Sequence, residues 1–230
     1  MLGRALCIMS GGLDSTVSAY MAASLGYEIV ALHFDYGQRT AEREKSSFHR
    51  ICEVLKPAKV TVLDLGCLGR LGGSALTDSN APLPTSLASK GEAPSTYVPF
   101  RNGIFLSLAG ALAEVEACDF IYIGVVEEDA NGYPDCSNAF ISSMQASLNE
   151  GRATSLSVQI VAPLVNKTKA EIIKLGLAVG APLGLTWSCY EGGAKACGLC
   201  SSCQLRLKGF EIAGLVDSID YEMRPSGDGI

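Results

Sequence analysis

Two adjacent glycines between an apolar run and an amphipathic stretch constrain this chain more than any other feature. Residues 5–9 (ALCIM) are short and apolar, as in a buried strand, and the apolar positions from 17 to 25 follow the spacing of one helix face. The segment is therefore expected to form a strand, a tight turn and a helix. Glycine lets the backbone adopt conformations closed to other residues and lets a ligand approach closely. Because unpaired N–H groups at a helix N-terminus favour an anion, we expect a phosphate at this turn.

The residues of this turn are the candidate nucleotide ligands. They are Ser10, Gly11, Gly12, Leu13, Asp14, Ser15 and Thr16. A Gly-Gly connection without any ligand is the alternative interpretation. The full string, SGGLDS, resembles the PP-loop SGGxDS of the ATP pyrophosphatases, which join the α-phosphate of ATP to a substrate oxygen and release pyrophosphate. No Gly-Lys-Ser/Thr follows the glycines, so the turn is not a Walker A loop.

Apolar runs and helical spacings alternate along the chain. Further strands are expected at residues 28–34, 60–65 and 120–126, and helices at 40–55, 104–115 and 170–179. This alternation predicts an α/β fold with a doubly wound parallel sheet, whose ligands bind beyond the carboxyl ends of the strands. Gln38 and Arg39 follow the second strand and are expected near the nucleotide, although a surface loop with an ordinary arginine would look the same.

Length and composition limit the possible functions. A chain of 230 residues is long enough for one α/β core, expected over residues 1–185, with a small C-terminal lobe over 186–230. The net charge of −6 argues against a broad basic surface for nucleic acid. No apolar run approaches the roughly 18–20 residues that would cross a bilayer, so we expect no membrane segment and a cytoplasmic protein.

Polar residues after the third expected strand form a second group of candidates. Residues 72–99 are rich in Gly, Ser, Pro and Thr and are expected to form a mobile loop, either a lid or a linker. Arg101 and Asn102 then begin a helix, where they either cap it or bind an anion. The acidic run at 127–136 follows a strand, and a carboxylate there could accept hydrogen bonds from a guanine-like N–H edge, although most acidic loops are only solvated. Lys167 precedes another helix and is a candidate for the ATP phosphates or a solvated lysine.

Four of the nine cysteines gather near the C-terminus. They are Cys189, Cys197, Cys200 and Cys203. Four thiolates with a C-x₂-C spacing suit a closed tetrahedral Zn²⁺ site, which is normally structural because no position is left for substrate. An iron–sulfur cluster and unligated thiols are the alternatives.

Six sequence blocks, in order, extend the resemblance to nearly the whole chain. They are SGGLDST, FDYGQR, PSTYVPFRN, GVVEEDANGYPDC, PLVNKTKAEI and SCY…CGLCSSCQLR. Together they resemble the 7-cyano-7-deazaguanine synthase family. The resemblance implies an adenine nucleotide α-hydrolase-like fold, a structural zinc, Mg²⁺ with ATP, and conversion of 7-carboxy-7-deazaguanine and ammonia to the nitrile (preQ0) in queuosine biosynthesis. It also favours a homodimer. Thr40 and Ser137 stand where family members often carry His and a basic residue.

The expected chemistry is that of an ATP-dependent carbon–nitrogen ligase, in which an acyl adenylate and an amide precede the nitrile. The loop residues would hold pyrophosphate, and Asp14 would bind Mg²⁺ or order the loop. Lys167 and Arg101 would neutralise phosphate or the substrate carboxylate. Residues expected at the deazapurine are Tyr97, Arg101, Asn102, Glu127, Asp129, Tyr133 and Asp135. A tRNA-modifying PP-loop enzyme and a zinc-stabilised ATP sensor without turnover are the alternatives.

Overall fold

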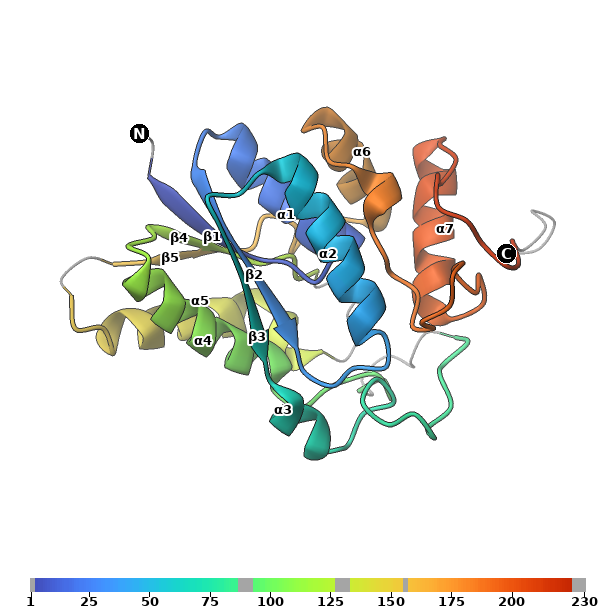
Figure 1. Cartoon of the computed structure of the whole chain (residues 1–230), viewed down its shortest axis with the longest axis horizontal. Helices are drawn as coiled ribbons and strands as arrows, with labels where there is room; N and C mark the ends of the chain where they lie inside the picture. Colours follow the sequence, from blue (N-terminus) through green and yellow to red (C-terminus); the bar gives the residue numbers. More distant parts are fainter. Residues whose placement is uncertain (1–2, 87–92, 127–132, 155–156, 225–230) are drawn as a thin grey trace.

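The computed structural model of the chain contains one parallel sheet with helices on both faces (Figure 1). It describes residues 3–86, 93–126, 133–154 and 157–224. In chain order the elements are β1 (Arg4–Ile8), α1 (Leu13–Ser24), β2 (Glu28–Asp35), α2 (Ala41–Leu55), β3 (Lys59–Asp64), α3 (Gly66–Arg70), α4 (Arg101–Val115), β4 (Phe120–Tyr122), the 3₁₀ turn η1 (Pro134–Cys136), α5 (Asn138–Glu150), β5 (Gln159–Val161), α6 (Lys169–Ala178), the 3₁₀ turn η2 (Leu183–Leu185) and α7 (Ser201–Ala213).

The sheet order, β3-β2-β1-β4-β5, confirms the doubly wound α/β prediction. Every strand pair is parallel. The chain moves outward from β1 to β3 and then returns to place β4 on the other side of β1. Strand order therefore reverses between β1 and β4, and in such sheets ligands bind in the crevice outside the carboxyl ends at this point.

The two faces of the sheet bury separate apolar clusters. Helices α1, α2 and α6 pack on one face, with Val17, Phe48 and Ile172 fully buried against β1 and β2. Helices α4 and α5 cover the opposite face, where Leu106 and Ile141 pack on β1, β2 and β4. The central strands read as continuous apolar runs because both of their faces are covered.

Several predicted bounds need correction. The last strand before the acidic run ends at Tyr122, four residues earlier than expected, and α3, α5 and β5 were not predicted. The last helix, α7, starts at Ser201 with Cys200 as its N-cap, so Cys203 lies in its first turn. Helix α7 lies beside α6, outside the sheet (Figure 1).

The part of the loop 72–99 that the structure describes is tethered at both sides. The backbone N–H of Arg39 donates to the carbonyl of Leu76 (2.8 Å), and the N–H of Ser201 donates to that of Pro84 (3.1 Å). The segment therefore bridges the β2–α2 turn and the start of α7.

Candidate functional site

A cavity of about 330 Å³ opens where the strand order reverses, beyond the carboxyl ends of β1, β2 and β4. Its walls come from the glycine loop, the β2–α2 turn, the start of α4 and the C-terminal lobe. Of the predicted site residues that the structure describes, the cavity is lined by Ser10, Gly12, Leu13, Asp14, Ser15, Gln38, Arg101, Asn102 and Tyr133.

The glycine loop is held against α2 by a close backbone approach. Gly11 has φ +79°, and a Cβ there would lie 2.5 Å from the carbonyl oxygen of Glu44. No larger residue fits this conformation and this space together. The Ser10 and Ser15 hydroxyls lie 3.1 Å apart, and the N–H of Gly12 donates to Ser10 Oγ (3.2 Å). The turn is thus organised before any ligand binds.

Thr16 lies behind this turn, not in the cavity wall. Its side chain is fully buried, and its hydroxyl donates to the carbonyl of Gly12 at 2.7 Å. This places Thr16 as a support for the loop backbone, whereas Ser10 and Ser15 face the cavity.

Two residues beyond the end of β4, a glycine that sequence reasoning missed packs against the N-terminus of α1. A Cβ on Gly124 would lie 2.6 Å from the backbone nitrogen of Ser15 and 2.7 Å from its Cα. This contact brings the segment that leaves β4 directly against the loop that follows β1. Glycine is frequent enough that only a predicted strand order, with β4 beside β1, could have identified this one.

A lysine other than the predicted one reaches the loop. Lys169 Nζ lies 2.9 and 2.8 Å from the two carboxylate oxygens of Asp14, and both residues line the cavity. Lys167 does not line it. Thr168 is the N-cap of α6 in a capping box with Glu171, so Lys169 occupies the first helical position. The T-x-x-E spacing was the available sequence evidence for this placement.

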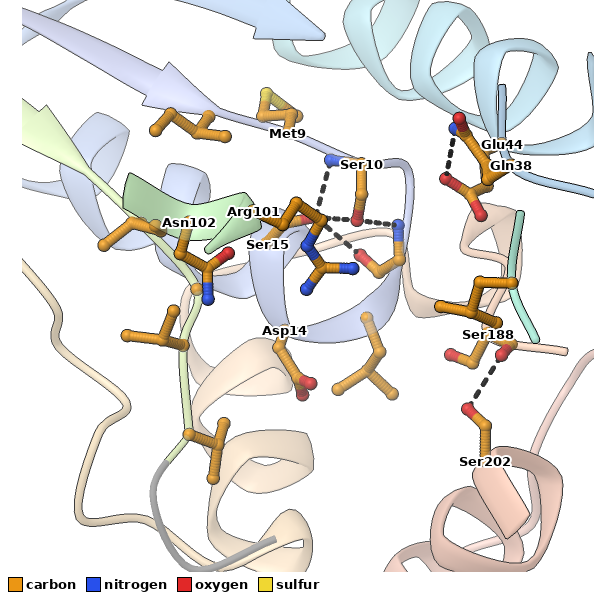
Figure 2. Close-up of a pocket in the computed structure, with 18 of the residues that line it drawn as sticks. Met9, Ser10, Asp14, Ser15, Gln38, Glu44, Arg101, Asn102, Ser188 and Ser202 are labelled. Atoms are coloured by element: carbon orange, nitrogen blue, oxygen red, sulfur yellow. Dashed lines mark hydrogen bonds between the residues drawn. The ribbon is translucent and has the colours of Figure 1, made fainter. Parts of the chain in front are cut away.

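Arg101 projects into the cavity from the start of α4. Figure 2 shows its side chain and that of Asp14 extending into the space in front of the loop. The guanidinium donates to the Tyr36 hydroxyl (3.3 Å) and lies 5.8 Å from the centroid of the Phe105 ring. Burial raises the pKa of Tyr36, so its phenol stays neutral.

Asp135 and Asn102 bind each other rather than extending side by side into the cavity. The Asp135 carboxylate accepts from the backbone N–H of Asn102 at 3.0 Å, and the Asn102 amide donates to the Asp135 carbonyl at 3.3 Å. Asp135 is buried and outside the cavity wall. It therefore fixes the first turn of α4, and with it Arg101.

Aromatic hydroxyls line the compartment beside Arg101. Tyr133 hydrogen-bonds to Thr96, and both line the cavity together with Tyr190. Burial raises the pKa of Tyr133 and of Tyr190, so both phenols are uncharged near neutral pH. Tyr97 lies outside the lining, where its ring packs edge-on against Tyr133. Glu127 and Asp129 lie outside the described residues.

The β2–α2 turn is held by a carboxylate. Gln38 accepts from the N–H of Tyr36 (2.9 Å) and donates to Glu44 (3.0 Å), and the Thr40 hydroxyl donates to the other oxygen of Glu44. Burial raises the pKa of Glu44, and the bonds from Thr40 and Gln38 oppose that rise. Thr40 and Glu44 thus fix the side chain of Gln38, which in turn holds the backbone of Tyr36.

Two other residues of interest lie outside the cavity wall. Arg39 donates to the carbonyl of Ala81 (2.8 Å), which attaches the turn to the long loop. Ser137 is the N-cap of α5 and accepts from the N–H of Phe140 (3.2 Å). Both are accounted for by structural contacts.

The segment 187–205 forms one wall of the cavity and carries the four cysteines. Trp187, Ser188, Tyr190, Ser202 and Leu205 line the wall, and Ser202 donates to the carbonyl of Ser188 (Figure 2). The four Sγ atoms of Cys189, Cys197, Cys200 and Cys203 lie within 4.8 Å of one another.

The sulfur spacing fits a tetrahedral zinc ion. Sγ separations are 3.5 Å for Cys189–Cys197 and 3.9 Å for Cys197–Cys203. Zn–S bonds of about 2.3 Å in a tetrahedron require sulfurs about 3.8 Å apart. Backbone N–H groups of Glu191 and Leu199 also donate to these sulfurs, as thiolates favour. The cluster can hold zinc, as predicted.

Comparison with known proteins identifies the family. A family model described as "Queuosine biosynthesis protein QueC" matches residues 4–214. The chain belongs to the QueC family. This confirms the resemblance predicted from the six sequence blocks.

Curated relatives in the QueC family match over almost their whole length. A 7-cyano-7-deazaguanine synthase of Campylobacter jejuni subsp. jejuni serotype O:2 is 54% identical over 223 residues, which covers 96% of this chain and 100% of the relative. One from Campylobacter curvus is 57% identical over 219 residues, which covers 95% and 97%.

A solved structure supports the fold alone. A 4-thiouridine synthetase–RNA complex with bound ATP matches with a TM-score of 0.51 and 16% identity, over 92% of this chain and 50% of that protein.

Among the helices that the structure describes, none has the length and apolar character needed to span a membrane.

We expect Gly124→Ala to weaken ATP binding by at least about tenfold, because the new methyl group would displace the Ser15 backbone at the loop. Isothermal titration calorimetry with ATP measures this. Gly151→Ala is the matched control, since its Cβ would meet only the Ser147 carbonyl at 3.4 Å. Equal ATP affinities for the two variants would contradict the role given to Gly124.

Proposed function

We propose that this chain is a 7-cyano-7-deazaguanine synthase, which uses ATP to convert 7-carboxy-7-deazaguanine and ammonia into the nitrile. The observation that carries the proposal is the cavity itself, in which an anion-binding glycine loop faces a compartment of aromatic rings and one arginine. A planar, acidic heterocycle suits that compartment, and the names of the curated relatives agree.

The nucleotide side of the cavity suits the triphosphate of ATP. N–H groups at the start of α1 and the hydroxyls of Ser10 and Ser15 supply donors at the loop. Lys169, held at the loop by Asp14, adds a positive charge that can be shared with a phosphate oxygen. We therefore assign to Lys169 the phosphate contact that the sequence suggested for Lys167.

Mg²⁺ belongs to the proposal as the ion that accompanies ATP. Asp14 offers a carboxylate beside the phosphates, which Mg²⁺ prefers as a ligand. When bound, the ion would neutralise charge on the leaving pyrophosphate. Asp14 already faces Lys169, so it has a second role in holding that side chain toward the loop.

The acceptor side suits the substrate carboxylate and ring. Arg101 can bind the carboxylate, and Tyr36 orients the guanidinium by accepting one of its N–H bonds. Phe105, Tyr133 and Tyr190 offer apolar faces and neutral hydroxyls for a purine-like ring. We propose that Glu127 and Asp129 bind the edge of the ring. Tyr97 and Asn102 would support the residues that contact the substrate, and Asp135 would act through Asn102.

The chemistry balances with two ATP per nitrile. A carboxylate oxygen attacks the α-phosphorus, the bond to the pyrophosphate breaks, and an acyl adenylate forms. Ammonia then attacks the acyl carbon and displaces AMP, leaving the amide after loss of a proton. The amide oxygen attacks a second α-phosphorus and displaces a second pyrophosphate. The C–O bond then breaks to release AMP, and loss of both N–H protons of the former amide leaves the nitrile. Within this sequence the protein positions the carboxylate against the α-phosphate and stabilises charge on the departing pyrophosphate.

The cysteine cluster, the domains and the assembly of the chain complete the proposed function. The zinc of the cysteine cluster would be structural, since all four ligands come from the chain. We further propose an α/β nucleotide-binding unit at 1–185 with the C-terminal lobe at 186–230, free ammonia as nitrogen donor, a homodimer, and action in the cytoplasm.

The test of this function is mass spectrometry of the products after incubation with 7-carboxy-7-deazaguanine, ammonium, Mg²⁺ and ATP. We expect the nitrile together with AMP and pyrophosphate. Formation of AMP without nitrile would contradict the acceptor assignment, and the absence of any nucleotide turnover would contradict the enzyme assignment.

We expect Lys169→Met to lower kcat by about 10²-fold, because the variant loses a charge placed at the developing pyrophosphate. Lys167→Met, two residues earlier and outside the cavity wall, should stay within about twofold. Steady-state pyrophosphate release measures both. A larger loss in the Lys167 variant would restore the assignment made from sequence.

A further inference from the structure

Trp187 joins the glycine loop to the cysteine cluster. Its backbone N–H donates to the carbonyl of Gly11 at 2.9 Å. Its side chain is 4% exposed and packs in one apolar cluster with Cys189, Cys200 and Cys203. Trp187 therefore bonds the proposed nucleotide loop through its backbone and belongs to the same apolar cluster as three of the proposed metal ligands.

Helix α2 holds both partners of this junction. The Arg43 guanidinium lies 4.2 Å from the centroid of the Trp187 ring, a cation–π contact. The next residue, Glu44, supplies the carbonyl against which Gly11 packs. The loop backbone is thus held between two elements. Helix α2 contacts Gly11 through Glu44 and Trp187 through Arg43, and Trp187 is itself bonded to Gly11.

Helix α7 fixes the residues on either side of Trp187. The Arg206 guanidinium donates to the hydroxyls of Thr186 (2.7 Å) and Ser188 (3.2 Å), and it is neutralised by Asp217 at 2.6 and 3.0 Å. Arg206 is 2% exposed. Cys203 lies three positions before Arg206 on α7, so the two buried side chains are neighbours on one face of that helix.

We propose that residues 186–189 couple metal occupancy of the cysteine cluster to nucleotide binding at the glycine loop. The proposal rests on the proposed function, because it takes ATP as the ligand of the loop and zinc as the ligand of the cluster. Without the ion, the four cysteine sulfurs lose the metal bonds that would link them to one another. The segment that carries the Trp187 N–H then gains conformational freedom. A nucleotide must then order that segment as it binds, which lowers its affinity.

The coupling acts in both directions. Two ligands that change each other's binding do so by the same factor, so ATP must tighten zinc binding as much as zinc tightens ATP binding. Zinc affinity is measured by competition between the protein and a chromogenic chelator, with and without saturating ATP. ATP affinity is measured by calorimetry with and without zinc. We expect each ligand to raise the affinity for the other by about tenfold, which is within the usual range of such couplings.

Two variants test the path through Trp187. Trp187→Ala removes the ring and its contacts while keeping the backbone N–H, and it should reduce the factor to below about two. Arg43→Leu removes the charge over the ring and should act in the same direction. Ile212→Ala, at an exposed position of α7, is the control and should keep the full factor.

The outcomes separate this proposal from the function on which it rests. If zinc-loaded protein binds ATP but zinc affinity does not change with ATP, the coupling is wrong and the proposed function stands. If zinc-loaded protein binds no ATP, both are overturned. A Trp187→Ala protein that keeps the wild-type factor contradicts the path. If that variant does not fold, Arg43→Leu decides by the same criterion.

Discussion

Close backbone contacts at the strand-order reversal determine the rest of this site. Gly11 packs on the Glu44 carbonyl, and Gly124 packs on Ser15, so the loop has main chain on two sides with no side chain between. The Trp187 N–H then adds a third contact, from the C-terminal lobe. Because these contacts fix where the N–H groups of α1 point, they decide where an anion can bind.

Charge in the cavity is divided between its two sides. Lys169 stands at the glycine loop with Asp14 as its partner, and Arg101 stands across the cavity with the neutral phenol of Tyr36. In the proposed reaction, the negative charge on the leaving pyrophosphate meets Lys169, and the acidic acceptor meets Arg101. Under this proposal, the two cations compensate the repulsion between the two anions that must react.

Local patterns predicted the glycine loop, the order of the main strands and helices, and the four cysteines, because each depends on neighbours in sequence. Lys169, Gly124 and Tyr190 escaped prediction because their roles depend on contacts with residues far away in the chain. For Asp135, the local sequence suggested a role that the distant contacts do not support. Its acidic loop suggested a ligand-binding carboxylate, but the fold brings it to the first turn of α4, where backbone N–H groups need an acceptor.

We propose that this cavity joins a substrate oxygen to the α-phosphorus of ATP, and an oxygen-transfer experiment distinguishes this reaction from attack at another phosphorus. Substrate carrying ¹⁸O at both carboxylate positions is converted with unlabelled ATP, and the AMP and phosphate products are examined by mass spectrometry. Attack at the α-phosphorus predicts one ¹⁸O in each AMP, with two AMP for every nitrile and none of the label in pyrophosphate. Label in inorganic phosphate, with ADP as the other product, would show attack at the γ-phosphorus and would overturn the proposed reaction.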